Sequence, residues 1–188
     1  MRELVYYVAV SMDGYIAAPD GDFSAFPVNP ATVGALFERY PETCPAQARE
    51  LFGVTGRPRR FDTVVMGART YAPAREAGMD TVYPSLREIV VTHQELPNDG
   101  PMDVLRGDVA GHIKHLKAEP GLDIWLCGGA DLAGQLFDLI DEVQLKVNPV
   151  ILGAGVPLFQ SGLRVTPMRL VSSEQLPGGV VLTTYRRE

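Results

Sequence analysis

Short apolar runs without polar alternation recur along the chain, and such runs predict strands that are buried on both faces. The first run, Leu-Val-Tyr-Tyr-Val-Ala-Val at 4–10, is rich in the β-branched and aromatic residues that favour strands. Four comparable runs follow at 63–66, 88–92, 123–127 and 142–147. We therefore expect these five segments to form the interior of one sheet.

Helical periodicity occupies stretches between these runs. Apolar residues recur three and four positions apart at 31–40, 108–117 and 132–140, and Pro120-Gly121 provides a stop after the second stretch. Strands that alternate with helices predict an α/β fold with a mostly parallel central sheet, covered by helices on both faces.

The end of the chain has a different pattern. Segments 169–176 and 180–186 flank Pro177-Gly178-Gly179, which predicts an antiparallel hairpin attached to the sheet. The stretch 41–60 is rich in Pro and Gly and could be a linker, but its Leu-Phe pair at 51–52 favours an ordered connection. We expect one domain over residues 1–188.

Composition and charge narrow the class of protein. Hydrophobic residues make up 46% of the chain and charged residues 21%, as in ordinary globular domains. The formal net charge of -6 disfavours nucleic acid as a partner. The first apolar run is too short to span a membrane, and two distant cysteines, Cys44 and Cys127, predict neither a disulfide framework nor a metal site. We expect no membrane association and a cytoplasmic location.

Two predicted strands run directly into helices through glycines. At 67–71 the sequence is Gly-Ala-Arg-Thr-Tyr, and at 128–132 it is Gly-Gly-Ala-Asp-Leu. Backbone N–H groups at a helix start, with a nearby arginine and hydroxyl, favour a phosphate. Either junction alone could be an ordinary turn, but two on neighbouring parallel strands predict a dinucleotide site. No P-loop motif occurs, and Gly153 and Gly155 are interpreted as turn residues.

The order of short motifs is more specific than any one of them. Ser-x-Asp-Gly-x-Ile-Ala stands at 11–17, Met-Gly-x-Arg-Thr-Tyr at 66–71, Val-Val-Thr at 90–92 and Gly-Gly-Ala at 128–130. This order resembles the dihydrofolate reductase superfamily. The segment 149–159 is typical of the branch that contains the reductase domain of bacterial riboflavin-biosynthesis deaminase–reductases. The resemblance implies a dihydrofolate-reductase-like three-layer α/β/α fold, NADPH binding and hydride transfer.

By this resemblance, each motif has an expected role. Arg69 and Thr70 after Gly67 would contact the adenosine phosphates, and Thr92 and His93 would lie near the 2′-phosphate and adenine. The nicotinamide would be flanked by Val10 and Ile16, and Ser24 and Phe26 would face the substrate pocket. The pyrophosphate would be cradled by Gly128, Gly129, Ala130, Asp131 and Leu132, often with a cis peptide between the paired glycines.

Several positions depart from the family pattern. Ala68 stands where many relatives have a basic residue, so a preference for NADPH over NADH would depend mainly on Arg69. Folate reductases have a carboxylic acid on the first long helix, where this chain offers Asn29 and Thr32. Riboflavin-pathway reductases have a lysine in the first strand and a glutamate before the paired glycines. These two places are Tyr7 and Cys127 here, so the sequence supports neither substrate well.

The proton donor and several other candidates have alternative interpretations. Asp13 and Asp22 are the nearest candidate donors, and each could instead be a turn or capping residue. The histidines at 112 and 115 lie on a helix with Lys114 and Lys117, which favours a solvated face over a metal site. We expect Trp125 to pack in the core and Cys127 to be a small buried filler more readily than a wall of the cofactor cleft.

Two functions are therefore compatible with the chain. One is an NADPH-dependent reductase of a small heterocyclic or carbonyl-like compound, and the other is a non-catalytic nucleotide-binding or regulatory module on the same scaffold. No deaminase domain is expected, since the zinc-binding His and Cys set is absent from the sequence. The resemblance also predicts a homodimer, with segment 153–159 and the terminal hairpin as the interface.

Overall fold

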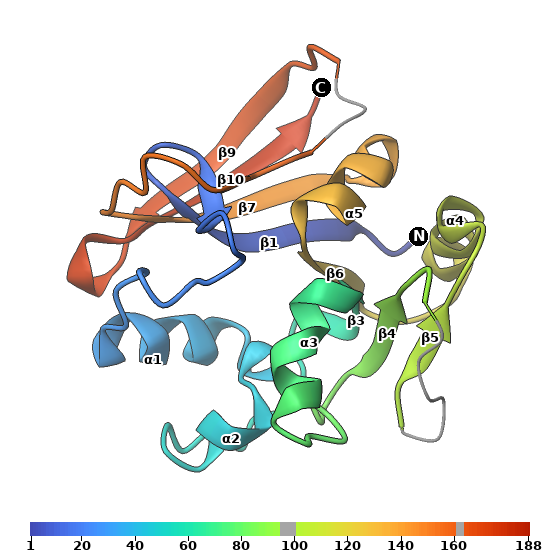
Figure 1. Ribbon diagram of the computed structural model, residues 1–188, viewed down its shortest axis with the longest axis horizontal. Helices are drawn as coiled ribbons and strands as arrows, with labels where there is room; N and C mark the ends of the chain where they lie inside the picture. Colours follow the sequence, from blue (N-terminus) through green and yellow to red (C-terminus); the bar gives the residue numbers. More distant parts are fainter. Residues whose placement is uncertain (95–100, 161–163) are drawn as a thin grey trace.

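A computed structural model describes residues 1–94, 101–160 and 164–188 of the chain. Its main sheet has eight strands in the order β5-β4-β3-β6-β1-β7-β10-β9 (Figure 1). The parallel strands are β1 (Leu4–Ser11), β3 (Phe61–Gly67), β4 (Arg87–Val91), β5 (Asp103–Leu105), β6 (Asp123–Gly128) and β7 (Glu142–Asn148). The terminal hairpin of β9 (Met168–Gln175) and β10 (Val181–Arg187) pairs antiparallel with β7. The predicted fold class is thus confirmed.

Helices cover both faces of the sheet, as the sequence predicts. Residues of α1 (Pro30–Arg39) and α3 (Ala68–Glu76) pack with Val5, Tyr7 and Trp125 on one face. Residues of α4 (Val109–Ala118) and α5 (Ala130–Gln135) pack with Leu4 and Tyr6 on the other. Alternate residues of β1 therefore feed two separate cores, which explains why this strand is apolar throughout. Figure 1 shows α1 and α3 on one side of the sheet and α5 on the other.

The third predicted helix, at 132–140, is wrong in both its start and its length. Helix α5 begins at Ala130, because Gly129 already takes the N-cap position. It ends at Gln135, since Leu136 has φ -95° and ψ 6°, and a short 3₁₀ turn follows at Phe137–Leu139. Leu136 and Ile140 are nevertheless buried. The apolar periodicity therefore indicates which residues are buried, and these continue past the end of the helix.

The stretch 41–60 is an ordered connection, as predicted, and a buried carboxylate holds its end. It contains a 3₁₀ turn at Pro41–Thr43 and the short helix α2 (Ala46–Arg49). Glu42 is fully buried and accepts backbone N–H groups from Arg59 at 3.1 Å, Arg60 at 2.7 Å and Phe61 at 2.8 Å. Three such bonds satisfy a carboxylate that would otherwise be costly to bury. Glu42 thereby fixes the entry into β3.

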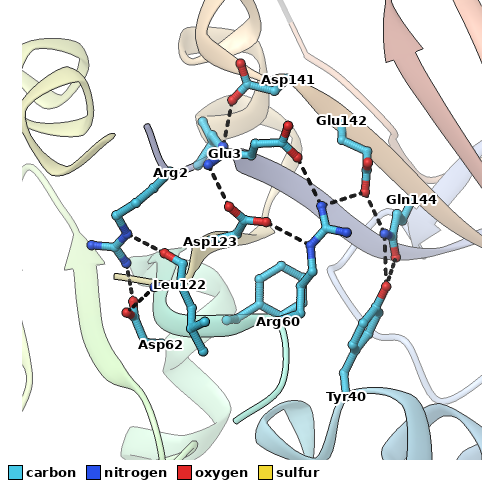
Figure 2. A network of polar contacts seen from close by, with 12 residues as sticks. Arg2, Glu3, Tyr40, Arg60, Asp62, Leu122, Asp123, Asp141, Glu142 and Gln144 are labelled. Atoms are coloured by element: carbon cyan, nitrogen blue, oxygen red, sulfur yellow. Dashed lines mark hydrogen bonds and ion pairs between the residues drawn. The ribbon is translucent and has the colours of Figure 1, made fainter. Parts of the chain in front are cut away.

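Ionic side chains tie together the amino ends of the parallel strands (Figure 2). The Arg60 guanidinium lies 2.9 Å from Asp123, 3.1 Å from Glu3 and 3.2 Å from Glu142. The Glu142 side chain is buried, and Arg186 of β10 also pairs with it at 2.9 Å. These contacts join residues at the starts of β1, β6 and β7, so the network holds one edge of the sheet in register.

Lys117 is a correction to the predicted solvated face of α4. Its side chain is buried, forms an ion pair with Asp141, and donates to the Leu139 carbonyl oxygen at 2.9 Å. Lys114 and His115 are exposed, as predicted, whereas His112 is half-buried. A lysine on a mostly polar helix face can still be buried where a strand start offers a carboxylate.

Three short strands follow no clear sequence pattern. Besides β5, these are β2 (Tyr15–Ala17) and β8 (Val156–Pro157), which pair in a small separate sheet. Gly155 permits this pairing, because a Cβ there would lie 2.1 Å from the Ala17 carbonyl oxygen. Gly153 has φ +76°, in keeping with its predicted role as a turn residue. In the described part of the chain, no helix is long and apolar enough to cross a membrane.

Candidate cofactor and substrate site

The two glycine junctions predicted from the sequence lie in contact at the carboxyl edge of the sheet. Strands β3 and β6 are neighbours, and Met66 is in register with Gly128. A Cβ on Gly67 would lie 3.7 Å from the Gly128 carbonyl oxygen and 3.8 Å from the Gly129 nitrogen. The Gly128–Gly129 peptide bond is cis, and Gly128 has φ +124°, a conformation that favours glycine. The junctions thus form one continuous backbone surface.

The helices that start at these junctions have open N-terminal donors. Neither α3 nor α5 has a side-chain cap, and α3 has no acidic residue in its first turn. By contrast, Asn29 caps α1 and Asp108 caps α4. Uncapped N–H groups together with the positive end of the helix dipole favour an anion. These two helix starts are therefore suited to hold phosphates, and α3 more so, because Asp131 in the first turn of α5 opposes an anion there.

Side chains beside the helix starts add to this surface. Arg69 and Thr70 are exposed, and Arg69 forms no ion pair with any residue in the described ranges. The Thr70 hydroxyl lies 3.6 Å from the position of a Cβ on Gly129. Exposed, unpaired Arg69 is thus available for a ligand. The residues present fit a nucleotide that carries phosphates at both junctions.

The other predicted cofactor residues lie at the same edge but differ in what they expose. Val10 and Leu132 are buried, and Ile16 is half-buried. His93, which follows the end of β4, is exposed. Thr92 is buried, and its hydroxyl accepts the Gln94 N–H at 3.0 Å. At the second junction, Ala130 is buried, and the Asp131 carboxylate accepts a hydrogen bond from the side-chain amide of Gln135 at 2.9 Å. Because the Leu132 side chain is buried, Leu132 offers its backbone rather than its side chain to a ligand at this edge.

A pocket of about 200 Å³ opens on the face of the sheet that α1 covers. Its walls combine polar and apolar surface and include four aromatic residues, and Cys127 in its wall directly precedes Gly128 of the cis peptide. The pocket therefore adjoins the glycine surface. Its lining residues are Tyr7, Val8, Ala9, Leu36, Phe37, Thr43, Tyr83, Trp125, Cys127 and Lys146.

Three neighbouring strands form the floor of the pocket. Tyr7 comes from β1, Cys127 from β6 and Lys146 from β7. Trp125 packs in the core as predicted, and its indole N–H donates to the Tyr7 carbonyl oxygen at 2.9 Å. Cys127 was expected to be a buried filler, but it is only half-buried and lines the pocket. The reason is its place at the end of β6, where the glycines that follow leave space above the strand.

The sequence patterns did not single out Lys146. The Lys146 ammonium lies 3.9 Å from the centre of the Tyr7 ring. A signal was present, because Glu142, Gln144 and Lys146 alternate with apolar residues and so share one face of β7. Polar residues at every second position of an interior strand indicate that this face of the strand is not covered by a purely apolar core.

Burial shifts the pKa values of the titratable side chains that line this pocket. It lowers the pKa of Lys146 to about 8, and the neighbouring Cys127 opposes this shift. Burial also raises the pKa of the Cys127 thiol to about 11 and raises the pKa values of Tyr7 and Tyr83 above the ordinary tyrosine value. At neutral pH the thiol and both phenols are neutral, and Lys146 is mostly protonated. Among the described residues, Lys146 therefore supplies the only charged side chain in the pocket wall.

Asp13 and Asp22, the predicted proton-donor candidates, are engaged in turns. Asp13 accepts the Ser11 hydroxyl at 2.6 Å, the Leu152 N–H at 3.1 Å and the Gly153 N–H at 2.7 Å. Asp22 accepts the Ser24 N–H at 3.0 Å. The hydrogen bond from Ser11 lowers the pKa of Asp13, and the bonds from Ser24 lower the pKa of Asp22. Both carboxyls are thus ionised at neutral pH, which favours the turn interpretation.

Ser24 and Phe26, the predicted substrate-pocket residues, lie on the loop between β2 and α1. Ser24 is exposed and Phe26 is half-buried. Neither belongs to the wall of the pocket. Their assignment to the substrate stays a prediction.

Comparisons with known proteins agree with this architecture. A family model described as the RibD C-terminal domain matches residues 2–182. The uncharacterized proteins YwjB and YyaP of Bacillus subtilis are 29% and 24% identical to this chain; each alignment covers 98% of the chain, with 98% of YwjB and 94% of YyaP.

Solved structures extend the comparison to the fold. A putative riboflavin biosynthesis protein from Shewanella sp. PV-4 is 26% identical, with a TM-score of 0.69, covering 100% of this chain and 99% of that one. Dihydrofolate reductase from Enterococcus faecalis, complexed with NADP(H), is 14% identical with a TM-score of 0.68, covering 99% of this chain and 96% of that one. At this identity the second likeness shows the fold alone. The chain therefore has a dihydrofolate-reductase-type fold and belongs to the RibD C-terminal domain family.

Proposed function

We propose that this protein is an NADPH-dependent reductase that transfers a hydride to a small heterocyclic or carbonyl-like compound. The observation that carries the proposal is the contact between two open helix starts at the carboxyl edge, directly beside a pocket of about 200 Å³. A dinucleotide needs two phosphate-binding points and a neighbouring space for its reactive ring and the substrate.

Different residues of the chain would bind different parts of the cofactor and substrate. Backbone N–H groups after Gly67 and Gly129 would hold the phosphates, and Arg69 would favour the additional phosphate of NADPH over the hydroxyl of NADH. Bound NADPH would supply the hydride. The pocket beside Cys127 would hold the acceptor and exclude water, so that the reacting groups are held close together. The NADP(H) complex of the structurally similar Enterococcus faecalis protein supports this choice of cofactor.

A binding measurement with matched arginine variants tests the proposal. We expect NADPH to raise the melting temperature, and Arg69→Ala to weaken NADPH by about tenfold or more while changing NADH little, because a charge-assisted contact to phosphate is lost. Arg75→Ala is the control, since Arg75 is also exposed and lies in the last turn of α3, away from the helix start. If neither dinucleotide stabilises the protein, the proposal is wrong.

A turnover measurement separates the reductase from a non-catalytic nucleotide-binding module. The specific observation that favours the module is that no carboxylate lines the pocket in the part of the chain that the structure describes. We expect NADPH oxidation with at least one compound from a panel of pterins, aminopyrimidines, flavins and quinones. Tight NADPH binding without oxidation by any of them would favour the module.

We also infer that the protein forms a homodimer through the sheet face near the terminal hairpin. A second, apolar pocket of about 250 Å³ lies there, between the turn after α5 and strands β7, β9 and β10. Leu158 and Phe159 of the predicted interface segment line it, and Leu170 and Val171 of β9 are exposed nearby. An exposed apolar surface of this kind favours a protein contact. A monomer in light scattering at micromolar concentration would contradict the inference.

A further inference from the structure

Lys146 is a cation without a counter-ion in the pocket beside the proposed cofactor surface. Within the described residues, its ammonium forms no ion pair and no hydrogen bond, and its one specific contact is the face of the Tyr7 ring at 3.9 Å. A ring face attracts the charge but accepts none of the three N–H bonds in the way an oxygen does. A partly buried ammonium in this state gains from any ligand oxygen that reaches it.

The groups around Lys146 do not compensate its charge. The titratable groups that share the pocket wall are Tyr7, Tyr83 and Cys127, and burial keeps all three neutral near pH 7. Helix α1 contributes only Leu36 and Phe37 to the wall, and the following 3₁₀ turn contributes Thr43. Glu42 of that turn is committed to three backbone N–H groups at 59–61. The charges of Glu42 and Glu88 still reach the pocket tyrosines Tyr7 and Tyr83. Among the described residues that line the wall, however, Lys146 is the one with a formal charge.

The size and walls of the pocket limit what can meet this charge. At about 200 Å³ the pocket is smaller than the ~300–1,000 Å³ sites that take drug-sized ligands. Four of its ten lining residues are aromatic, namely Tyr7, Phe37, Tyr83 and Trp125. Such walls favour a flat ring, because aromatic faces and edges pack against it with little unfilled space.

We propose that Lys146 anchors the substrate, and that the substrate is a small flat ring with an anionic or carbonyl oxygen that binds Nζ directly. The inference rests on the proposed function in that it assigns the acceptor half of the same site. A pocket that carries an acid selects cationic ligands, whereas this pocket is expected to select anionic or neutral ones. Rings with a cationic amidine group are expected not to bind, because Lys146 repels them and no carboxylate among the described lining residues pairs with them.

The chain offers a direct observation of this residue, because it contains only three lysines, at 114, 117 and 146. In protein labelled with ¹³C at the lysine ε carbon, each lysine gives one signal, and Lys114→Met and Lys146→Met variants assign them. We expect the Lys146 signal to titrate near pH 8, well below the ordinary lysine value of about 10.4. Titration of Lys146 in the ordinary range would contradict the buried, uncompensated state.

Three probes of one shape test the chemistry: benzoate, neutral benzamide and cationic benzamidine. We expect benzoate to shift the Lys146 signal and to raise its titration midpoint, benzamide to bind more weakly, and benzamidine not to bind. Benzoate needs the ammonium form, so its affinity falls as the pH rises above about 8. Lys146→Met should weaken benzoate by about tenfold or more, while Lys114→Met leaves it unchanged.

Two results would overturn the anchor: preferential binding of benzamidine, or benzoate affinity that is absent in the wild type or unaltered in Lys146→Met. NADPH affinity measured on the same samples keeps the two proposals apart. We expect it to be equal in the wild type and Lys146→Met, because Lys146 lies in the acceptor pocket. Failure of NADPH to bind the wild type would count against the proposed function, whatever the lysine signal shows.

Discussion

The amino and carboxyl edges of the parallel strands are built from opposite kinds of residue. At the amino edge, Arg60 and Glu142 each contact two or more oppositely charged side chains (Figure 2). At the carboxyl edge, glycines meet at Gly67 and Gly128, two helices start without caps, and Lys146 has no counter-ion among the described residues. One edge satisfies its polar groups internally, whereas the other leaves them available to a ligand.

This difference separates stability from binding within one sheet. Paired charges at the amino edge stabilise the fold when intact and are costly when one partner is removed. Unpaired groups at the carboxyl edge cost stability and become favourable only when a ligand is bound. We therefore expect substitutions at the two edges to have different signatures, from a large loss of stability to a gain.

The largest effect on stability is expected for Glu142→Gln. The substitution keeps the shape of a buried side chain but removes the charge that faces Arg60 and Arg186. We expect a loss of about 3 kcal/mol in the free energy of unfolding, measured by urea denaturation. Glu174→Gln is the control, because its pair with Arg39 is about half exposed and should contribute less than about 1 kcal/mol. Equal losses in the two variants would remove the distinction between the edges.

An intermediate effect, on binding rather than stability, is expected for Gly67→Ala. Gly67 has φ -75°, and the added methyl group would meet the Gly128 carbonyl oxygen at an ordinary 3.7 Å, so the fold accommodates it. The methyl group occupies the surface proposed for the nucleotide. We expect NADPH affinity, measured by calorimetry, to fall about tenfold or more.

The matched control for this substitution is Gly34→Ala. Nothing lies within 4 Å of the added methyl group at this helical position of α1. We expect unchanged NADPH affinity and a gain of about 1 kcal/mol in stability from helix propensity. Unchanged affinity in Gly67→Ala would argue against a nucleotide at the glycine surface.

A smaller effect on stability than that of Glu142→Gln is expected for Lys146→Met, and its sign is opposite. The folded-state pKa of Lys146 is lowered to about 8, so below this pH the folded protein carries the unfavourable buried charge. Wild-type stability then rises, relative to Lys146→Met, between about pH 8 and the unfolded lysine value of about 10.4.

At neutral pH, Lys146→Met should therefore be more stable than the wild type, by about 1–2 kcal/mol after allowance for partial solvent exposure. Urea denaturation at neutral and alkaline pH measures both the gain and its decrease. The exposed Lys114 provides the control in Lys114→Met. A loss of stability at neutral pH would show that Lys146 is compensated in the folded protein.

Sequence patterns predicted most of the sheet, because a strand buried on both faces needs continuous apolar residues. All five predicted strands are present, with shifts of one to a few residues at their ends, and so is the terminal hairpin. The limits of α5 were wrong, since Leu136 and Ile140 stay buried after the helix ends. The short strands β2, β5 and β8 were not predicted, because two or three residues carry too little periodicity to identify a strand.

The glycine motifs, with Arg69 and Thr70, were identifiable in the sequence because a strand that turns directly into a helix needs those residues locally. Their mutual contact, and the meeting of Tyr7, Cys127 and Lys146 at one pocket, follow from the strand order β3-β6-β1-β7. Lys146 pairs in register with Ala9, far away in the sequence. Local chemistry thus determined which segments could bind a nucleotide, whereas sheet topology decided which charge faces the pocket, because pairing between distant strands sets the neighbours of each side chain.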